Sequence, residues 1–83
     1  MKLVYKDEAI KRLKKIRPQD KAKAKKKIQS LVLNPYVGKP LKGGLHGLFS
    51  LKAWPLRIIY SFDPNAQTIT IETIDYRGDV YKN

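Results

Sequence analysis

The spacing of apolar residues changes about halfway along the chain, from a helical period to a two-residue alternation. In the first half, residues 2–6 predict a short strand. Residues 7–16 predict a helix with one buried face, and Asp7 stands where its side chain can cap the first turn. The apolar residues expected on that face are Ala9, Ile10, Leu13 and Ile16.

A second helix is expected over residues 19–33. Pro18 stops the first helix and is tolerated in the first turn of the next one, and Asn34-Pro35 ends the second helix. Its expected buried stripe consists of Ala24, Ile28, Leu31 and Val32. The two helices therefore form a hairpin with one apolar side and one side dense in lysine.

The second half of the chain predicts strands. Residues 38–47 form a glycine-punctuated loop, after which residues 48–53, 56–62 and 68–74 alternate in the manner of strands. The element order β-α-α-β-β-β predicts an α+β fold, in which the N-terminal helical hairpin packs on a small, mainly antiparallel sheet. A chain of 83 residues is sufficient for a single domain spanning residues 1–83.

A tight turn at Trp54-Pro55 predicts the register of the first hairpin, with Lys52 directly opposite Arg57. Alternation then divides the hairpin into two faces. The face expected under the helices carries Phe49, Leu51, Ile58, Tyr60 and Phe62. The open face carries Ser50, Lys52, Arg57, Ile59 and Ser61. Two cations directly opposite each other repel, and an anion between them would reverse that penalty; the alternative is two solvated cations on an open sheet.

The third strand is also two-faced. Ile69 and Ile71 are expected to point inward, and Thr68, Thr70 and Glu72 outward. Glu72 is a candidate general base or a salt-bridge partner for a neighbouring cation, and the second role is the commoner one for an isolated carboxylate on a basic surface.

The charge of the chain indicates its partners. Eighteen Lys and Arg residues against seven acidic residues give a formal net charge of +11. Such a surface attracts polyanions, so nucleic acid is the first partner to consider, an acidic membrane surface the second and an acidic protein the third. The lysines of the helices cannot all face the core and form a basic wall that suits an RNA backbone.

The composition excludes several other classes. The absence of cysteine excludes a disulfide scaffold, a thiolate zinc site and thiol chemistry. The single histidine, His46, cannot build a usual transition-metal site and is expected to shape a turn in the glycine loop, so no cofactor or metal is indicated. The first residues lack the apolar run of a signal peptide, and no segment is long and apolar enough for a membrane span. A cytoplasmic protein is therefore expected.

Three fragments in this order resemble the RelE/ParE toxin superfamily. They are residues 41–52 (LKGGLHGLFSLK), 56–60 (LRIIY) and 76–81 (YRGDVY). The N-terminal β-α-α arrangement fits as well, so the resemblance covers essentially the whole chain. It implies a toxin of a type II toxin–antitoxin pair. For the RelE branch it implies a metal-independent mRNA interferase, an endoribonuclease that cleaves mRNA in the ribosomal A site by attack of the 2′-hydroxyl on the adjacent phosphodiester.

The resemblance also implies roles for individual residues. Lys52 and Arg57 match strand cations that stabilise the dianionic transition state, Tyr81 matches a tyrosine that helps to deprotonate the 2′-hydroxyl, and Arg77 matches an arginine that assists the leaving group. The RNA-binding residues expected beside them are Lys11, Lys14, Lys15, Lys23, Lys26, Lys27, Lys42, Trp54 and Tyr76. Trp54 at the hairpin tip either stacks on a nucleobase or packs beside the hairpin.

The chain also departs from the family pattern. Asp75 stands where some members place their acting arginine, Tyr76 where many have histidine, and Ser50 where some have a second lysine. Two alternative functions therefore stay open: a ParE-like inhibitor of DNA gyrase that acts by binding, and a catalytically degenerate member that binds RNA or an antitoxin. In every case the implied partner is an acidic, RelB-like antitoxin that covers the Lys52–Arg57 face, in addition to mRNA and the ribosome for the nuclease.

Overall fold

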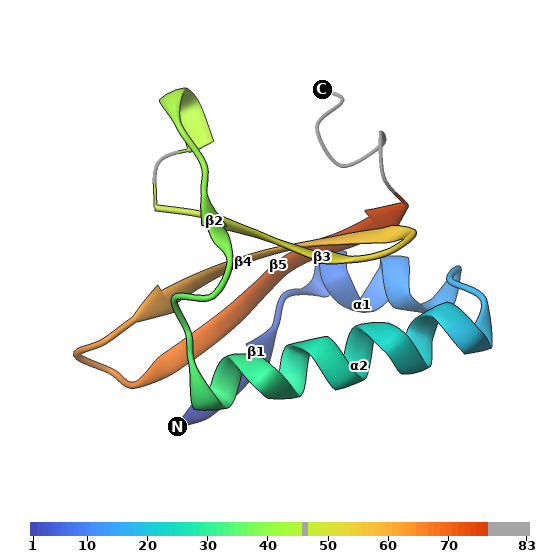
Figure 1. The fold of residues 1–83 in the computed structure, drawn as a ribbon, viewed down its shortest axis with the longest axis horizontal. Coiled ribbons are helices and arrows are strands. Elements are labelled where there is room, and N and C mark those ends of the chain that lie inside the picture. The colour runs from blue at the N-terminus through green and yellow to red at the C-terminus, as the bar shows by residue number, and fades with distance from the viewer. Residues whose placement is uncertain (46, 77–83) are drawn as a thin grey trace.

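The computed structural model describes residues 1–45 and 47–76 as a five-stranded sheet with two helices (Figure 1). The helices are α1 (Asp7–Lys14) and α2 (Pro18–Leu33), and a 3-10 turn, η1, spans Gly43–Leu45. The strands are β1 (Lys2–Tyr5), β2 (Lys39–Pro40), β3 (Phe49–Ala53), β4 (Leu56–Asp63) and β5 (Thr68–Tyr76). The expected α+β fold is confirmed, with β2 and η1 as additions inside the predicted glycine loop.

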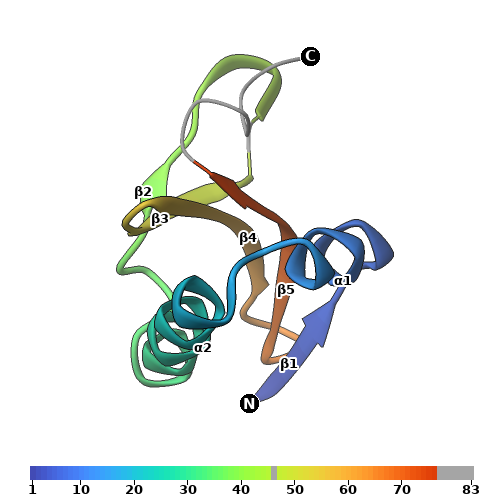
Figure 2. The ribbon, with the colours of Figure 1, turned by 90° about the vertical axis from the view of Figure 1, so that its right-hand side faces the viewer.

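The sheet has the order β1-β5-β4-β3-β2. β1 pairs with β5 in parallel, and the other neighbouring strands pair antiparallel. β1 covers only the first half of β5, because its last ladder pair joins Tyr5 to Ile71. α1 continues along the same edge of the sheet, and α2 lies across one face of it (Figure 2). Among the described residues, no helix is long and apolar enough to span a membrane.

The start of α1 differs from the expectation that Asp7 caps the helix. The amide of Lys6 bonds the carbonyl of Ile71, so strand pairing extends through Lys6, which takes the N-cap position with extended backbone. Asp7 is consequently the first helical residue rather than the cap, and its carboxylate lies where the helix dipole favours negative charge. Pro18 opens α2 as the first-turn residue.

Two apolar residues expected in the core are exposed to solvent instead. Ile10 is 42% exposed and Val32 is 41% exposed, so the predicted stripes were one residue too wide on each helix. The reason is that a single helical layer covers the sheet, which leaves the flanks of both helices outside. Ala24, Ile28 and Leu31 of α2 are buried as expected, and so is Ala9 of α1. Ile16 is buried too, but it lies in the turn after α1, which ends at Lys14 and not at residue 16 as predicted.

A β-bulge changes which residues of β5 face the core, so the inward face differs from simple alternation. Ile59 pairs with Thr73 while the next residue, Tyr60, pairs with Ile71, so Glu72 is an extra residue in the β4–β5 ladder. Because the bulge shifts the alternation by one, Ile71 and Ile74 are both fully buried although they are three residues apart. The inward face of the β3–β4 hairpin is as predicted, with Leu51, Ile58 and Tyr60 in the core.

Tyr60 ties the segment after α2 to the sheet. Its hydroxyl donates to the carbonyl of Pro35 at 2.8 Å and accepts from the amide of Gly38 at 2.9 Å. A Cβ at position 38 would lie 2.6 Å from the Tyr60 hydroxyl oxygen, so only glycine fits at this approach. This anchor determines where the chain enters β2, at Lys39.

Candidate functional site

Lys52 and Arg57 lie directly opposite each other in the β3–β4 ladder, as the turn at Trp54-Pro55 predicted. Their neighbours Leu51 and Ile58 are buried beneath the sheet, so alternation places the two cations on the opposite face. Lys52 is exposed and Arg57 is half-buried. Two cationic side chains at adjacent positions form a binding point for an anion.

A cleft of about 500 Å³ surrounds this pair. Its lining comes from α2, the segment leading into β2, and strands β2 to β4: Lys27, Val37, Lys39, Leu41, Ser50, Leu51, Lys52 and Arg57. Four of these residues carry a positive charge, and none of them is acidic. The cleft therefore has the electrostatics of an anion site, with the Ser50 hydroxyl as an additional hydrogen-bonding group.

Lys39 is a member of the cleft that sequence reasoning missed. It pairs with Ser50 in the two-residue strand β2, which brings it next to β3. A two-residue strand beside Pro40 in a glycine-rich loop carries too little alternation to be recognised from sequence. The only available signal was its positive charge in a loop that also contains Lys42, which is exposed and does not line the cleft.

The carboxylates nearest to this face are held by other cations. The Glu72 carboxylate forms an ion pair with Lys6 at 2.7 Å and accepts a hydrogen bond from the Ser61 hydroxyl at 3.1 Å. Asp75 pairs with Arg57 in the β4–β5 ladder, and its carboxylate forms an ion pair with Arg12 of α1. The geometry therefore supports Glu72 as a salt-bridge partner rather than as a general base. Both carboxylates have cationic partners outside the cleft.

Tyr76 lies on the opposite, helix-covered face. Its hydroxyl donates to Asp20 at 3.1 Å and accepts from the Arg17 side chain at 3.3 Å, and the Arg17 guanidinium lies 5.5 Å from the ring centroid. The hydrogen bond from Arg17 to Tyr76, reinforced by the charge of Asp20, raises the pKa of Arg17. The geometry thus gives Tyr76 a part in joining β5 to α2, away from Lys52 and Arg57.

Asp20 is a second residue that sequence reasoning missed. It is 3% exposed and lies in the first turn of α2, where its carboxylate accepts from Arg17 at 3.2 Å as well as from Tyr76. A buried carboxylate requires such partners. Its position two residues after Pro18 marked a helix start but gave no sign of burial.

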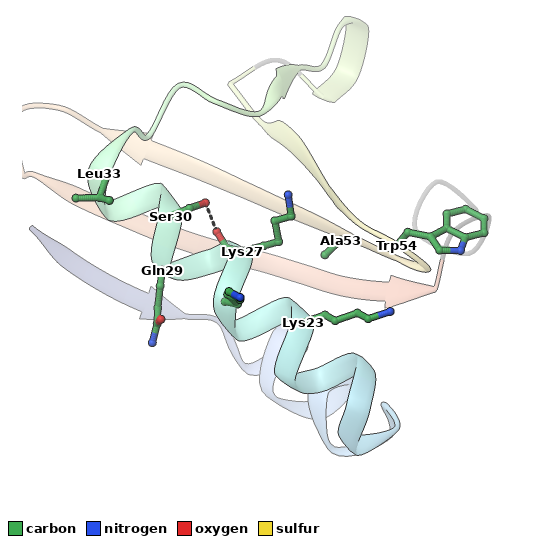
Figure 3. Close-up of a pocket in the computed structure, with 8 residues that line it drawn as sticks. Lys23, Lys27, Gln29, Ser30, Leu33, Ala53 and Trp54 are labelled. Atoms are coloured by element: carbon green, nitrogen blue, oxygen red, sulfur yellow. Dashed lines mark hydrogen bonds between the residues drawn. The ribbon is translucent and has the colours of Figure 1, made fainter.

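The remaining predicted RNA-binding lysines are exposed on the helical segments. Lys11 and Lys14 belong to α1, Lys15 follows it, and Lys23, Lys26 and Lys27 belong to α2. The three lysines of α2 line a groove of about 660 Å³ between this helix and the tip of the β3–β4 hairpin, where Trp54 stands (Figure 3). Lys27 lines this groove and the cleft, so the two hollows adjoin.

Three residues singled out in the sequence, His46, Arg77 and Tyr81, lie outside the described residues. The roles that the resemblance implies for Arg77 and Tyr81 therefore stay predictions. Within the part of the chain that the structure describes, no group of three or more His, Asp or Glu side chains is placed to hold a metal ion.

Known proteins share both this sequence pattern and this fold. The family model of ParE-like toxins of type II bacterial toxin–antitoxin systems matches residues 3–83. Toxin RelG of Mycobacterium tuberculosis is 39% identical over 46 residues, which are 55% of this chain and 53% of RelG. The match thus spans about half the length of that curated relative.

Solved structures extend the likeness over the fold. A chain of the toxin–antitoxin complex RelBE2 from Mycobacterium tuberculosis superposes with a TM-score of 0.85 at 29% identity, covering 92% of this chain and 96% of that one. The isolated RelE toxin of E. coli superposes with a TM-score of 0.77 at 18% identity, covering 96% of this chain and 89% of that one. The second likeness is one of fold alone.

Proposed function

Because this chain belongs to the ParE-like toxins of type II bacterial toxin–antitoxin systems, we propose that it is an endoribonuclease that cleaves mRNA in the ribosomal A site. The observation that carries the proposal is the Lys52–Arg57 pair in a cleft lined by two further lysines and by no carboxylate. This site suits a phosphodiester whose negative charge increases as the reaction proceeds.

RNA supplies its own nucleophile for this reaction. The 2′-oxygen forms a bond to phosphorus while the bond from phosphorus to the 5′-oxygen breaks, which leaves a 2′,3′-cyclic phosphate and a 5′-hydroxyl. Lys52 and Arg57 stabilise the dianionic transition state, Tyr81 helps to deprotonate the 2′-hydroxyl, and Arg77 assists the leaving 5′-oxygen, which takes up a proton from solvent to become the 5′-hydroxyl. The protein needs to supply only alignment and charge, so no metal or cofactor enters the proposal.

The RNA of the ribosome and of the bound message would be held by the lysines of the helices. Six of the proposed contacts are exposed on α1, on α2 and in the segment between them: Lys11, Lys14, Lys15, Lys23, Lys26 and Lys27. Contacts of this kind bind the RNA backbone and set the orientation of the toxin without reading sequence. A substrate bound to the translating ribosome implies action in the cytoplasm.

The proposed protein partner is an acidic, RelB-like antitoxin. Solved relatives of this fold include toxin–antitoxin complexes such as RelBE2 of Mycobacterium tuberculosis and intact RelBE of E. coli. With a formal net charge of +11 on this chain, an acidic segment that covers the Lys52–Arg57 cleft would neutralise the site and block access of RNA.

The test uses purified protein, ribosomes programmed with an mRNA and an open A site, and primer extension to map new ends. We expect the wild type to cleave and Arg57→Ala and Tyr81→Phe to lose most activity. The matched control is Lys2→Ala, which removes an exposed cation of β1 that does not line the cleft. Ribosome binding by the wild type without cleavage would contradict the nuclease.

One observation favours the alternative of gyrase inhibition. The matching family model is that of the ParE-like toxins, and the resemblance to the RelE/ParE superfamily implies that ParE-like members inhibit DNA gyrase. Expression in growing cells distinguishes the candidates: translation arrest with cut mRNA supports the nuclease, a DNA-damage response supports gyrase inhibition, and growth without effect supports a degenerate member.

A further inference from the structure

The groove beside Trp54 combines an exposed aromatic ring with a rim of lysines. Trp54 is 65% exposed at the turn between β3 and β4, and Leu33 at the end of α2 is 89% exposed. Among the described residues, the lining consists of Lys23, Lys26, Lys27, Gln29, Ser30, Leu33, Ala53 and Trp54. Figure 3 shows Lys23 and Lys27 extending from α2 toward the hairpin that carries Ala53 and Trp54.

This groove is continuous with the anion cleft. Lys27 lines both hollows, and Lys52 of the cleft is followed directly by Ala53 and Trp54 of the groove. A chain of linked phosphates bound at the cleft would therefore bring its neighbouring nucleotide to the groove. There the nucleotide would meet positive charge for its phosphate and an aromatic face for its base.

We propose that the groove is a nucleobase subsite for single-stranded RNA. The base next to the phosphate held by Lys52 and Arg57 stacks on Trp54, and Lys23 and Lys27 bind the phosphate of that nucleotide. Lysines alternating with an exposed aromatic ring are the means by which proteins bind single strands without reading sequence. This inference takes its substrate class from the proposed nuclease, but it concerns binding and can be tested without cleavage.

An acidic peptide is the competing occupant, because lysines attract carboxylates as well as phosphates. Two features favour the nucleotide. The groove joins a cleft lined by four cationic residues, and the exposed apolar group of the groove nearest to Lys52 in the chain is the flat ring of Trp54 at a turn. Every base offers a π-face to such a ring, whereas a peptide requires a series of matching apolar pockets.

Trp54 is the only tryptophan in the chain, so its fluorescence reports on this site alone. The probe is a 2′-O-methyl RNA of about six nucleotides, which lacks the attacking hydroxyl and cannot be cleaved. We expect it to quench the fluorescence on binding. An abasic oligomer with the same number of phosphates should bind through the lysines more weakly and leave the fluorescence unquenched.

The variants are followed by anisotropy of a labelled oligomer. Trp54→Ala should weaken binding of the base-bearing oligomer about 5- to 100-fold, the range expected for loss of one stacked base. Trp54→Phe, which keeps an aromatic face, should recover most of that loss. Lys2→Ala removes an exposed cation of β1 that lines neither the groove nor the cleft, and should have no effect.

Equal affinities for the base-bearing and abasic oligomers, or unchanged binding by Trp54→Ala, would overturn the inference and leave the groove to an acidic peptide. The ribosome assay separates this result from the proposed function. Wild-type cleavage with no dependence on Trp54 would overturn only the base subsite. Trp54-dependent binding by a wild type that does not cleave would overturn only the nuclease.

Discussion

Asp75 stands opposite Arg57 in the β4–β5 ladder and forms an ion pair with Arg12 of α1. It therefore places a negative charge in the same cross-strand row as Lys52 and Arg57. Asp75→Asn should raise affinity for single-stranded RNA about two- to fivefold in 50 mM salt and less in 200 mM salt, because screening weakens the effect. Anisotropy of a labelled oligomer measures this change.

The control is Glu8→Gln, which removes a carboxylate from the same Arg12 at the start of α1. Both changes raise the net positive charge of +11 by one, but only Asp75 belongs to the cross-strand row of Lys52 and Arg57. An equal gain in both variants would mean that net charge alone sets RNA affinity. Loss of the Arg12–Asp75 pair should lower the free energy of unfolding by less than about 1 kcal/mol, because Arg12 is partly exposed.

Gly38→Ala should destabilise the fold by about 2–3 kcal/mol. The new Cβ would lie 2.6 Å from the Tyr60 hydroxyl oxygen and 2.7 Å from the ring carbon Cε1, so the anchor that joins Gly38 and Pro35 to Tyr60 must open. Urea unfolding followed by circular dichroism measures the loss. Gly44→Ala is the matched control, because a Cβ there meets no atom within 4 Å.

The same substitution should disturb the cleft, since the anchored segment carries Val37 and Lys39 into its lining. RNA affinity of Gly38→Ala is expected to fall under conditions where the variant is still folded. A variant as stable as Gly44→Ala would show that the segment can move away from Tyr60 without cost.

The register of the β3–β4 hairpin was predictable because a two-residue connection leaves little freedom in strand pairing. That register was sufficient to place Lys52 beside Arg57 on the open face. The bulge at Glu72 was not predictable, because alternation alone gives no sign of an inserted residue. The bulge buries Ile74 together with Ile71, and only the strand pairing in the structure reveals this.

The rest of the candidate site depends on contacts between distant segments. Lys39 reaches the cleft through a two-residue strand, and Lys27 reaches it from α2 across the domain. The clustering of Asp20 with Tyr76 joins residues 56 positions apart. Local patterns carry no information about such pairs. The sequence predicted the strand cations, and Lys27 as an RNA contact, but not that Lys27 and Lys39 line the same cleft, nor the face on which Tyr76 lies.

The stability of the fold should fall in alkaline solution. Burial raises the pKa of Tyr60 above the ordinary value of 10.0, although the Gly38 amide opposes this, and burial raises the pKa of Tyr5 in the same way. Stabilisation from a raised pKa is complete below the unfolded value and is lost as pH rises through the folded value. Urea midpoints should therefore decrease as pH rises above 10.

Tyr60→Phe removes one of the two tyrosine hydroxyls whose raised pKa values cause this loss of stability. Its stability at pH 8 should be lower than that of the wild type, because Gly38 and Pro35 lose their partner, but its further loss between pH 8 and pH 11 should be smaller. The exposed Tyr36 provides the control variant, Tyr36→Phe, which should keep the wild-type slope. Parallel slopes for all three proteins would show that the lysines, and not Tyr60, determine the alkaline loss.

Ribosome binding should weaken steeply between 50 and 200 mM salt, because phosphate contacts release counterions from RNA. The slope of the logarithm of the binding constant against the logarithm of salt concentration measures the number of contacts. Each lysine that binds a phosphate should contribute about 0.7–0.9 to that slope.

Replacing Lys23, Lys26 and Lys27 together with glutamine should lower the magnitude of the slope by about 2, whereas Lys2→Gln on β1 should leave the slope unchanged. A flat dependence in the wild type would contradict an electrostatic grip on ribosomal RNA, and an unaltered slope in the triple variant would place the grip on α1 instead.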